Sequence, residues 1–381
     1  MLRGVREVPV EKVLKFGSAE SVGMDTGRIK KVCDFVDKAV SEGAFPGAVV
    51  LVARKGVIAT HKVYGKAVAI PPEKARPMEL NTIFDLGSLT KPVATATSTM
   101  MLLERGKLRL DDPVNLFIPS FAGGEKEKVT IRDLLTHTSG LPAWKPLYKE
   151  CKTRDDFLRE LCQMELEYHP EEKVVYSCLG FILLTFILEK ITGENLASFS
   201  SREIFKPLDM KDTFFNPPES LRDRIVATER CSWRNRVLIG EVHDENAYGM
   251  GGVSGNAGLF STAHDVAVYA QMMLNEGKYG GVRVLSSSSV RLMTRNCTSK
   301  LNEPRGLGWL LKSEKASSAG DLFSSASFGH TGFPGTCLWI DPEKELIAIL
   351  FTNRIHPTRE NEAILRIRPL FHNLVASAIK D

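Results

Sequence analysis

The segment AVVLVARKGVIATHKV, residues 48–63, contains two runs of β-forming residues separated by a turn. Its parts 48–53 and 57–63 are rich in Val, Ile and Ala and flank the short sequence RKG, a pattern that predicts a β-hairpin. Near the other end of the chain, TCLWIDPEKELIAILFT, residues 336–352, has the same arrangement around the turn-forming sequence DPEK. A hairpin at each end of one chain predicts that the four strands share a single antiparallel sheet.

A helical pattern lies outside each hairpin. Apolar residues recur at steps of three and four from a candidate N-cap at Asp25 or Thr26 to Gly43, and again from Ile364 to Ile379. Between the hairpins, similar patterns predict five further helices, at residues 94–105, 131–135, 154–164, 179–191 and 264–275. We therefore expect an α/β (α+β) fold, in which the N- and C-terminal helices flank an antiparallel sheet and a helix-rich lobe is inserted between the hairpins.

The length of 381 residues allows two or three domains at the usual ~150 residues per domain. The paired ends favour one unit of two lobes instead. We expect residues 1–24 to form an N-terminal extension and residues 25–381 to form a single domain. Its α/β lobe would comprise about residues 25–87 and 280–381, and its helical lobe about residues 88–279.

The composition excludes several classes of protein. Apolar residues make up 43% of the chain and charged residues 25%, values typical of soluble globular proteins. The net charge is +4 and the basic residues are scattered, so we expect no nucleic-acid partner. The longest apolar stretch, residues 179–188, is too short to span a membrane, and the N-terminal sequence MLRGVREVPVEKVLKFGS lacks the apolar core of a signal peptide. We therefore expect a cytoplasmic protein with no membrane partner.

Neither the cysteines nor the glycine-rich segment predicts a cofactor. The seven cysteines are widely spaced and contain no CxxC pair, which argues against a zinc site and against a disulfide framework. Residues 249–258 approach a dinucleotide-binding fingerprint, but Ser254 occupies the third glycine position and no strand pattern precedes the segment. An irregular loop lining a cleft fits this segment better, and we expect neither a metal nor an organic cofactor.

The strongest chemical signal is the sequence Ser88-Leu-Thr-Lys91, which follows a β-like segment at 82–86 and precedes a predicted helix. On the first turn of a helix, residues three apart lie on one face, about 5–6 Å apart at Cβ, so the hydroxyl and the amine could share a proton. A helix N-terminus would also stabilise an oxyanion at this place. The same spacing recurs at Ser377 and Lys380, where the end of the last helix offers no such surroundings. The motif alone is therefore weak evidence.

Two further motifs follow in order: Tyr176-Ser-Cys178 at the start of an apolar helical segment, and His330-Thr-Gly332 before a predicted strand. With Ser88-Leu-Thr-Lys91, they make the sequence resemble the serine β-lactamase and penicillin-binding-protein superfamily, in particular its class C-like branch. This family carries SxxK, then YxN or a variant, then KTG or HxG. Further family-like segments lie at residues 110–114, 130–142, 207–213 and 258–262, so that the resemblance covers roughly residues 25–375.

The resemblance implies a β-lactamase/transpeptidase-like fold and a role for each matching residue. Ser88 would be the acylated nucleophile, Lys91 the base or proton shuttle beside it, and Tyr176 the second group that handles the proton. His330 would lie on the opposite strand. The backbone N–H groups of Ser88 and Phe333 would form the oxyanion hole.

Two groups, Lys91 and Tyr176, could take the serine proton. At its ordinary pKa of about 10.4, Lys91 would be neutral in about one molecule in a few thousand at pH 7, which costs roughly 4–5 kcal/mol. Burial in a cleft could lower this pKa toward ~7–8, while the Lys91 ammonium could stabilise a Tyr176 phenolate. Either group could be the base, and we expect one proton to be shared among Ser88, Lys91 and Tyr176.

Two departures from the family pattern bear on the substrate. Cys178 stands where many members carry an Asn that holds the acylamino chain of the substrate, and a thiol is only a weak hydrogen-bonding group. His330 would bind substrate together with Thr331 and Gly332. It stands where β-lactamases and carboxypeptidases usually carry Lys, and its side chain is largely neutral at pH 7.

We therefore expect a serine acyl hydrolase that forms an acyl-enzyme with small esters or amides. It would be an esterase, or an amidase or peptidase acting on D-configured or muropeptide-like substrates. A β-lactamase or a D-alanyl-D-alanine carboxypeptidase is the alternative. A non-catalytic ligand-binding protein on the same fold is a further alternative, which Cys178 suggests. The sequence predicts no oligomeric state.

Overall fold

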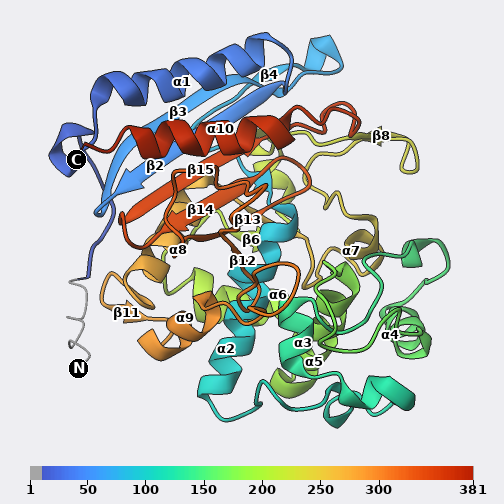
Figure 1. Ribbon diagram of the computed structural model, residues 1–381. Coiled ribbons are helices and arrows are strands. Elements are labelled where there is room, and N and C mark those ends of the chain that lie inside the picture. Colours follow the sequence, from blue (N-terminus) through green and yellow to red (C-terminus); the bar gives the residue numbers. More distant parts are fainter. Residues whose placement is uncertain (1–10, 381) are drawn as a thin grey trace, which may run out of the picture.

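One mostly antiparallel sheet in the computed structural model, which describes residues 11–380, contains strands from both ends of the chain (Figure 1). Its strand order is β1-β3-β2-β15-β14-β13-β12, with β4 beside β3. The strands are β1 (Lys15–Phe16), β2 (Gly47–Arg54), β3 (Val57–Val68), β4 (Arg76–Pro77), β12 (Leu310–Leu311), β13 (Phe328–Thr331), β14 (Cys337–Asp341) and β15 (Leu346–Thr352). Both predicted hairpins are confirmed, and β2 pairs with β15 in antiparallel register, with Val50 opposite Leu350.

The central strands β2 and β15 are buried on both faces, which explains why their sequences are continuously apolar rather than alternating. Along β2, Val49 and Leu51 belong to a core on one side of the sheet, while Val50 and Val52 belong to a second core on the other side. The sheet therefore separates two helical layers.

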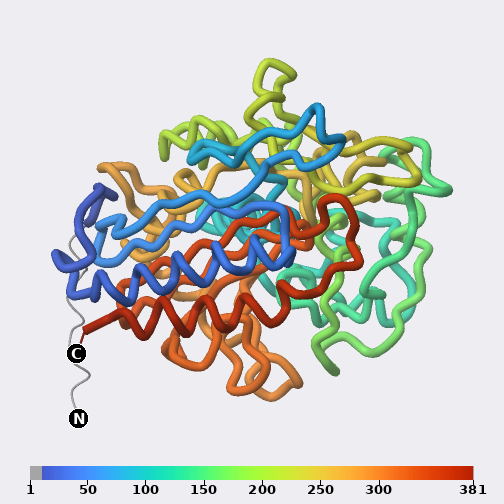
Figure 2. Tube along the Cα trace, turned by 90° about the horizontal axis from the view of Figure 1, so that it is seen from above, coloured from blue at the N-terminus to red at the C-terminus, as the bar shows by residue number. Residues whose placement is uncertain are grey.

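The terminal helices form the first layer. α1 (Thr26–Ser41) and α10 (Ile364–Ser377) lie side by side against the sheet (Figure 1 and Figure 2). Asp25 caps α1, because its side chain accepts a hydrogen bond from the Arg28 N–H at 2.8 Å. The apolar faces of both helices share one buried core with the sheet. The predicted terminal helices are therefore confirmed.

Helices that lie between the hairpins in sequence form the second layer, in which α8 packs directly against β2 and β15 (Figure 1). All five predicted helices are present, as α2 (Thr97–Glu104), α3 (Ile131–Thr136), α4 (Arg154–Gln163), α5 (Cys178–Thr192) and α8 (Ala263–Leu274). Further helices are α6 (Leu196–Ser200), α7 (Glu245–Gly249) and α9 (Ser287–Thr294). The predicted fold class is confirmed, while the boundaries proposed for the two lobes stay a prediction.

The helix expected from residue 94 begins differently from the prediction. A 3-10 turn, Gly87–Leu89, and a π-helical turn, Lys91–Ala96, precede α2. The Pro92 carbonyl within this stretch accepts hydrogen bonds from Thr97 Oγ1 at 2.9 Å and Tyr269 Oη at 3.2 Å. Side-chain hydroxyl groups that donate to a helix carbonyl in this way interrupt the regular backbone hydrogen bonds of an α-helix.

Short sheets outside the main sheet position the loops. β5 (Phe84–Asp85), which lies within the predicted β-like segment 82–86, pairs with β9 (Leu259–Ser261), and β9 pairs with β6 (Phe214–Phe215). β5 leads directly into the Gly87–Leu89 turn. Two hairpins are formed by β7 (Arg230–Cys231) with β8 (Arg236–Val237), and by β10 (Lys278–Tyr279) with β11 (Val282–Arg283).

Residues 1–10 of the expected N-terminal extension lie outside the described residues. The next part of the extension adds β1 to the sheet, in parallel with β3, with Phe16 opposite Ile58. No helix within residues 11–380 is long and apolar enough to cross a membrane. In the same part of the chain all seven cysteines are free, and no group of His, Cys, Asp or Glu side chains could hold a metal ion.

We expect Leu350→Ala in β15 to lower the free energy of unfolding by about 2–5 kcal/mol, because this side chain is fully buried and its removal leaves a cavity. The same substitution at Leu365 of α10, whose residue is 63% exposed, should change it by less than about 0.5 kcal/mol. Urea unfolding followed by circular dichroism measures both. Equal losses in the two variants would contradict the assignment of Leu350 to the core.

Candidate active site

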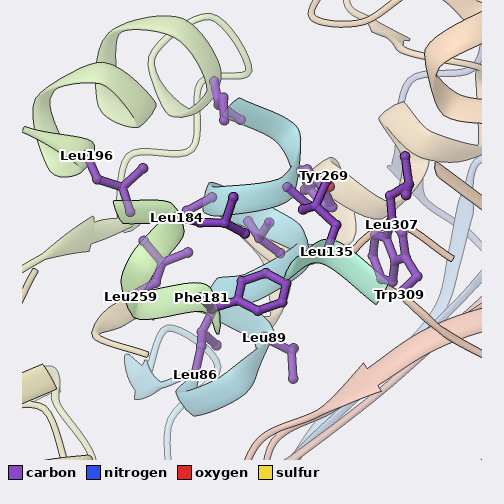
Figure 3. Packing of buried hydrophobic residues seen from close by; sticks show 14 of the residues in the cluster. Leu86, Leu89, Leu135, Phe181, Leu184, Leu196, Leu259, Tyr269, Leu307 and Trp309 are labelled. Atoms are coloured by element: carbon purple, nitrogen blue, oxygen red, sulfur yellow. The ribbon is translucent and has the colours of Figure 1, made fainter. Parts of the chain in front are cut away.

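Ser88 and Lys91 lie together at the junction between β5 and α2. Ser88 belongs to the Gly87–Leu89 turn, and Lys91 Nζ donates a hydrogen bond to Ser88 Oγ at 3.2 Å. The buried side chains of Leu86 and Leu89 anchor this turn in the core (Figure 3). The expected contact is therefore present. It is formed by a 3-10 turn and a π-turn, however, and not by the first turn of an α-helix.

Gly87 brings this turn close to the chain that follows β13. Its φ of +53° lies in the left-handed region that favours glycine. A Cβ at this position would lie 2.6 Å from Pro334 Cδ and 3.3 Å from the Phe333 backbone nitrogen. The close approach therefore needs glycine. It also brings the Phe333 backbone nitrogen close to the turn that carries Ser88, while the oxyanion hole stays a prediction.

Lys91 is fully buried, and its ammonium has three hydrogen-bond acceptors. Nζ donates to Ser88 Oγ at 3.2 Å, to Cys178 Sγ at 3.6 Å and to the Asn256 carbonyl at 3.0 Å, which uses all three N–H bonds of a charged lysine. Burial acts to lower the pKa of Lys91, but Cys178 and Tyr176 as anions would favour its charge, and the net direction of the pKa is upward. Burial thus acts in the expected direction, but the expected net lowering of the pKa of Lys91 is wrong, because the neighbouring acids outweigh burial.

Tyr176 lies beside the lysine with its hydroxyl unused. Lys91 Nζ is 4.7 Å from the centre of the Tyr176 ring, and this ring also packs on the His137 and His330 rings, at 4.5 and 5.9 Å between centroids. The Tyr176 Oη is buried and has no hydrogen-bond partner among residues 11–380. Burial raises the pKa of Tyr176, and the nearby Lys91 ammonium opposes this only in part. The pKa values of both Lys91 and Tyr176 are therefore raised, and the two groups form one coupled pair that holds its protons more tightly than usual.

The segment that follows α3 fixes the loop that carries this tyrosine. The His137 carbonyl accepts a hydrogen bond from the Val175 N–H at 2.9 Å, and His137 Nδ1 accepts one from the Ser177 N–H at 3.0 Å. The Ala143 carbonyl accepts a third from the Cys178 N–H at 2.9 Å. The backbone is thus held on both sides of the tyrosine, and Ser177 and Cys178 can begin α5 in a fixed position.

His330 lies on β13 as an uncharged side chain. Its Nδ1 is 2.8 Å from the Thr331 carbonyl, which can only accept a hydrogen bond, so Nδ1 carries the proton and Nε2 is an acceptor. Nε2 is buried without a partner among the described residues. Burial, together with the charges of Lys91 and Arg305, holds the pKa of His330 well below its usual value. The predicted absence of a fixed charge at this position agrees with the structure.

Arg305 is a neighbour of the site that no sequence motif marks. Its guanidinium lies 5.3 Å from the centre of the Tyr176 ring, and its buried side chain pairs with Glu303 at 2.9 Å. Its charge also contributes to the lowered pKa of His330. The arginine lies on an irregular segment between α9 and β12, where no periodicity or motif could have indicated it.

Asn256 is a second such neighbour. Its carbonyl accepts a hydrogen bond from Lys91 Nζ, and its Nδ2 is buried without a partner in the described part of the chain. Its Oδ1 accepts a hydrogen bond from Ser254 Oγ at 2.7 Å. Asn256 belongs to the glycine-rich segment 249–258, for which an irregular loop lining a cleft was predicted, so the sequence contained a signal for the loop but not for the residue.

Two arginines hold the turn that follows His330. Arg368 of α10 donates hydrogen bonds to the carbonyls of Gly332 at 2.9 Å and Thr336 at 3.0 Å. Arg354 Nε donates to the Phe333 carbonyl at 2.9 Å. The peptide group that contains the Phe333 N–H is thereby held through its Gly332 carbonyl, and the next peptide group is held through the Phe333 carbonyl, in both cases by a buried guanidinium group.

The structure brings the predicted site residues together and separates them from the second SxxK sequence. The residues gathered around the Ser88 turn are Ser88, Lys91, Tyr176, Cys178 and His330, with Thr331, Gly332 and Phe333 along the adjacent strand end. Ser377, in contrast, lies at the end of α10, where its hydroxyl donates to the Leu374 carbonyl at 2.9 Å. The catalytic roles of the gathered residues stay predictions.

A family model described as Beta-lactamase matches residues 32–370. The chain belongs to the beta-lactamase family. Among relatives of this β-lactamase-family chain, the N-acetylmuramyl-L-alanine amidase of Bacillus subtilis (strain 168) is 35% identical over 375 residues, which cover 90% of this chain and 84% of the relative. A protein of Escherichia coli (strain K12) named "Putative D-alanyl-D-alanine carboxypeptidase" is 32% identical over 380 residues, which cover 90% of this chain and 86% of the relative.

Solved structures confirm the fold of this β-lactamase-family protein. EstCE1, described as a hydrolase with promiscuous acyltransferase activity, superposes with a TM-score of 0.73 at 24% identity and covers 91% of this chain and 99% of its own. A penicillin-binding-protein homologue from Caulobacter crescentus gives a TM-score of 0.71 at 19% identity, covering 92% and 98%. Membership in the family makes the chain a serine hydrolase, as the sequence predicted.

The arginine contacts generate a prediction about the oxyanion hole. We expect Arg368→Lys to lower kcat by at least about tenfold with little change in KM, because an ammonium cannot hold the Gly332 and Thr336 carbonyls as the planar guanidinium does. Rates are measured per active site titrated with a covalent inhibitor, so that unfolded protein is not counted.

Arg366→Lys on the same helix is the matched control, because Arg366 is exposed and should leave both constants unchanged. A rise in KM alone for Arg368→Lys, or equal effects of the two variants, would show that Arg368 does not position the oxyanion hole.

Proposed function

We propose that this chain is an acyl hydrolase that cleaves small amides or esters through an acyl-enzyme on Ser88. The observation that carries the proposal is the contact between Ser88 Oγ and the buried Lys91 ammonium, beside the unpartnered hydroxyl of Tyr176. Ser88 itself is only half-buried, so a substrate can reach its hydroxyl. A partly open nucleophile against a closed proton-handling pair fits covalent catalysis.

The proposed reaction runs in two steps. Ser88 Oγ attacks the carbonyl carbon of the substrate, and its proton passes through the Lys91 and Tyr176 pair to the leaving nitrogen or oxygen. The oxyanion that forms is stabilised by the backbone N–H groups of Ser88 and Phe333. The bond to the leaving group breaks, which completes the acyl-enzyme. Water then attacks the acyl carbon, and a proton from this water passes through the same pair to Ser88 Oγ. The bond between the acyl carbon and Ser88 Oγ breaks, and a carboxylic acid is released.

The protonation of Lys91 and Tyr176 determines what must happen before Ser88 Oγ attacks the substrate. With its three N–H bonds donated and its pKa raised, Lys91 cannot accept the Ser88 proton in the resting state. One proton must first leave the Lys91 and Tyr176 pair, which we treat as one titrating unit. In that reactive form, the member of the pair that has lost its proton, either the Tyr176 phenolate or the neutral Lys91 amine, would accept the Ser88 proton and pass it on.

The hydrogen-bonding groups around Ser88 favour an amide or ester that needs no strong hydrogen bond from Cys178. Cys178 offers only a thiol that already accepts a hydrogen bond from Lys91, so it has little capacity to hold an acylamino chain. The neutral His330 presents an unpartnered acceptor, Nε2, which could receive a hydrogen bond from a substrate N–H or O–H. The amidase among the relatives supports amide cleavage.

A D-alanyl carboxypeptidase is the second candidate, and Arg305 favours it. The guanidinium near Tyr176 and His330 supplies the fixed positive charge that His330 lacks, and a substrate carboxylate could bind there. The pairing of Arg305 with Glu303 reduces this charge, which favours the amidase or esterase. A panel of p-nitrophenyl esters, muramyl amides, D-alanyl-D-alanine peptides and a chromogenic cephalosporin separates the candidates, because only a carboxypeptidase prefers the peptide with a free C-terminal carboxylate.

We expect a serine-directed phosphonate to label Ser88 and Ser88→Ala to lower hydrolysis of p-nitrophenyl acetate by at least about 1000-fold, because the nucleophile is lost. Ser377→Ala, in the second SxxK sequence, should keep full activity and full labelling. Mass spectrometry of the labelled peptide identifies the serine. Saturable binding of substrate by wild-type protein without labelling or turnover would instead support the non-catalytic alternative.

The raised pKa values of Lys91 and Tyr176 predict how activity depends on pH. A raised pKa keeps the pair fully protonated over a wider range, so its reactive form is gained only as pH rises toward the alkaline side. We expect kcat/KM to increase continuously from about pH 6 to 9 without a plateau. A profile that is already flat between pH 6 and 8 would contradict the assignment of this pair as the base.

A further inference from the structure

Three aromatic side chains form an exposed surface outside the site, which we call the aromatic shelf: Tyr148, Trp233 and Tyr248. Trp233 is 48% exposed and Tyr248 37% exposed, while Tyr148 is half-buried. The Trp233 ring packs edge to face on both tyrosines, with 4.6 Å between its centroid and that of Tyr148 and 5.8 Å to that of Tyr248. Large aromatic rings left open to solvent in a contiguous group mark interaction sites.

A buried arginine holds the shelf rigid from below. The Arg234 guanidinium lies 4.0 Å from the centre of the Tyr248 ring and 5.2 Å from that of Trp233. Its side chain is only 3% exposed, and its guanidinium donates hydrogen bonds to the carbonyls of Val242 and His243. The arginine therefore covers the inner side of both rings and leaves their outer side to solvent.

The chain segment that leads into the shelf helix contacts the oxyanion side of the site. Tyr248 lies on α7, and the chain just before this helix is tied to the Ser88 region, because the His243 N–H donates to Asp85 at 2.7 Å. The His243 ring stacks on the exposed Phe333 ring at 5.5 Å. The Asp244 carboxylate also raises the pKa of Lys91, although burial, Cys178 and Tyr176 have larger effects on it. The chain segment that leads into α7 therefore contacts both the strand before the Ser88 turn and the Phe333 ring.

The shelf is also tied to the opposite side of the site. The Tyr148 N–H donates to Asn246 Oδ1 at 3.0 Å, and Asn246 Nδ2 donates to the Lys145 carbonyl at 2.8 Å. The same loop begins at Ala143, whose carbonyl accepts the hydrogen bond from the Cys178 N–H. The shelf therefore connects both walls of the site through short, fixed contacts.

Planar polar groups border the rings. Arg236 forms a two-pronged ion pair with Glu241, with both hydrogen bonds at 2.7 Å, and its Nη2 lies 3.4 Å from the Tyr248 hydroxyl. A long acyl chain would need a continuous apolar groove, and a polyanion would need unpaired cations, whereas this arginine is paired. A sugar ring matches the combination, because its C–H face packs on an aromatic ring while its hydroxyls bond to carboxylate, guanidinium and phenol groups at the edge.

We infer that the aromatic shelf binds a sugar ring of the substrate, so that the protein cleaves an amide or ester whose acyl part is carried by a sugar. This inference rests on the proposed function, because it assigns the substrate class of the Ser88 site. A sugar acid joined to an amine through an amide would place its ring on the shelf and its carbonyl carbon beside Ser88. Hydrolysis would release the sugar carboxylate and the amine.

The kinetic test compares two substrates, N-acetylmuramyl-L-alanine and p-nitrophenyl acetate, which has no sugar. We expect Trp233→Ala to lower the ratio of their kcat/KM values by at least tenfold. Trp233→Phe should restore most of that ratio, because it keeps an aromatic face. Phe16→Ala is the control, since Phe16 is a 69% exposed aromatic residue on the edge strand β1, far from the site in the strand order. An unchanged ratio in Trp233→Ala would overturn the inference.

A binding test separates this inference from the proposed function. Calorimetry with Ser88→Ala should detect N-acetylmuramyl-L-alanine, and adding Trp233→Ala should weaken its Kd at least tenfold. Binding that is absent, or insensitive to Trp233, would overturn the shelf assignment even if Ser88 is labelled by the phosphonate. If binding depends on Trp233 but the wild-type protein shows no turnover, the hydrolase proposal is overturned and the shelf assignment stands.

Discussion

The pairing of β2 with β15 is the constraint on which the rest of the structure depends. It joins residues 47–54 to residues 346–352, so the chain between β4 and β12 must leave the sheet and return to it. The chain leaves through β3 and β5 into the Ser88 turn and returns through β13, whose end lies against Gly87. A long-range pairing of this kind is costly in chain entropy, and the two buried faces of the central strands offset that cost. The position of the site is therefore a consequence of sheet topology.

Within that frame, a single buried charge organises the chemistry. An unpaired ammonium in the interior would be strongly disfavoured, and Lys91 is accommodated because Ser88, Cys178 and Asn256 each accept one of its N–H bonds. The face of the Tyr176 ring adds a further favourable contact. Burial is the main cause of the raised pKa of Tyr176 and of the lowered pKa of His330. The Lys91 charge opposes the effect of burial at Tyr176 and adds to it at His330.

The sequence predicted those parts of the molecule that depend on local patterns. The hairpins and helices follow from periodicity, and the Ser88 to Lys91 contact follows from their spacing. Arg305, Arg354, Arg368 and Asn256 could not be predicted in this way, because each reaches the site from a distant segment through a single side chain or carbonyl. The π-turn before α2 was missed because it depends on the Tyr269 hydroxyl, which lies far along the chain. The direction of the Lys91 pKa was wrong because burial was considered without the acids that accompany it.

Four positively charged side chains lie around the site that contains the neutral His330, and each of them is already paired within the protein. The charge of Lys91 is used up by internal acceptors, Arg368 and Arg354 are engaged with backbone carbonyls, and Arg305 is paired with Glu303. Each of these cations is therefore already engaged within the protein. Shape, stacking and neutral hydrogen bonds must then supply the affinity. The exposed Trp233 ring, held from below by Arg234, is a surface of that kind beside the site.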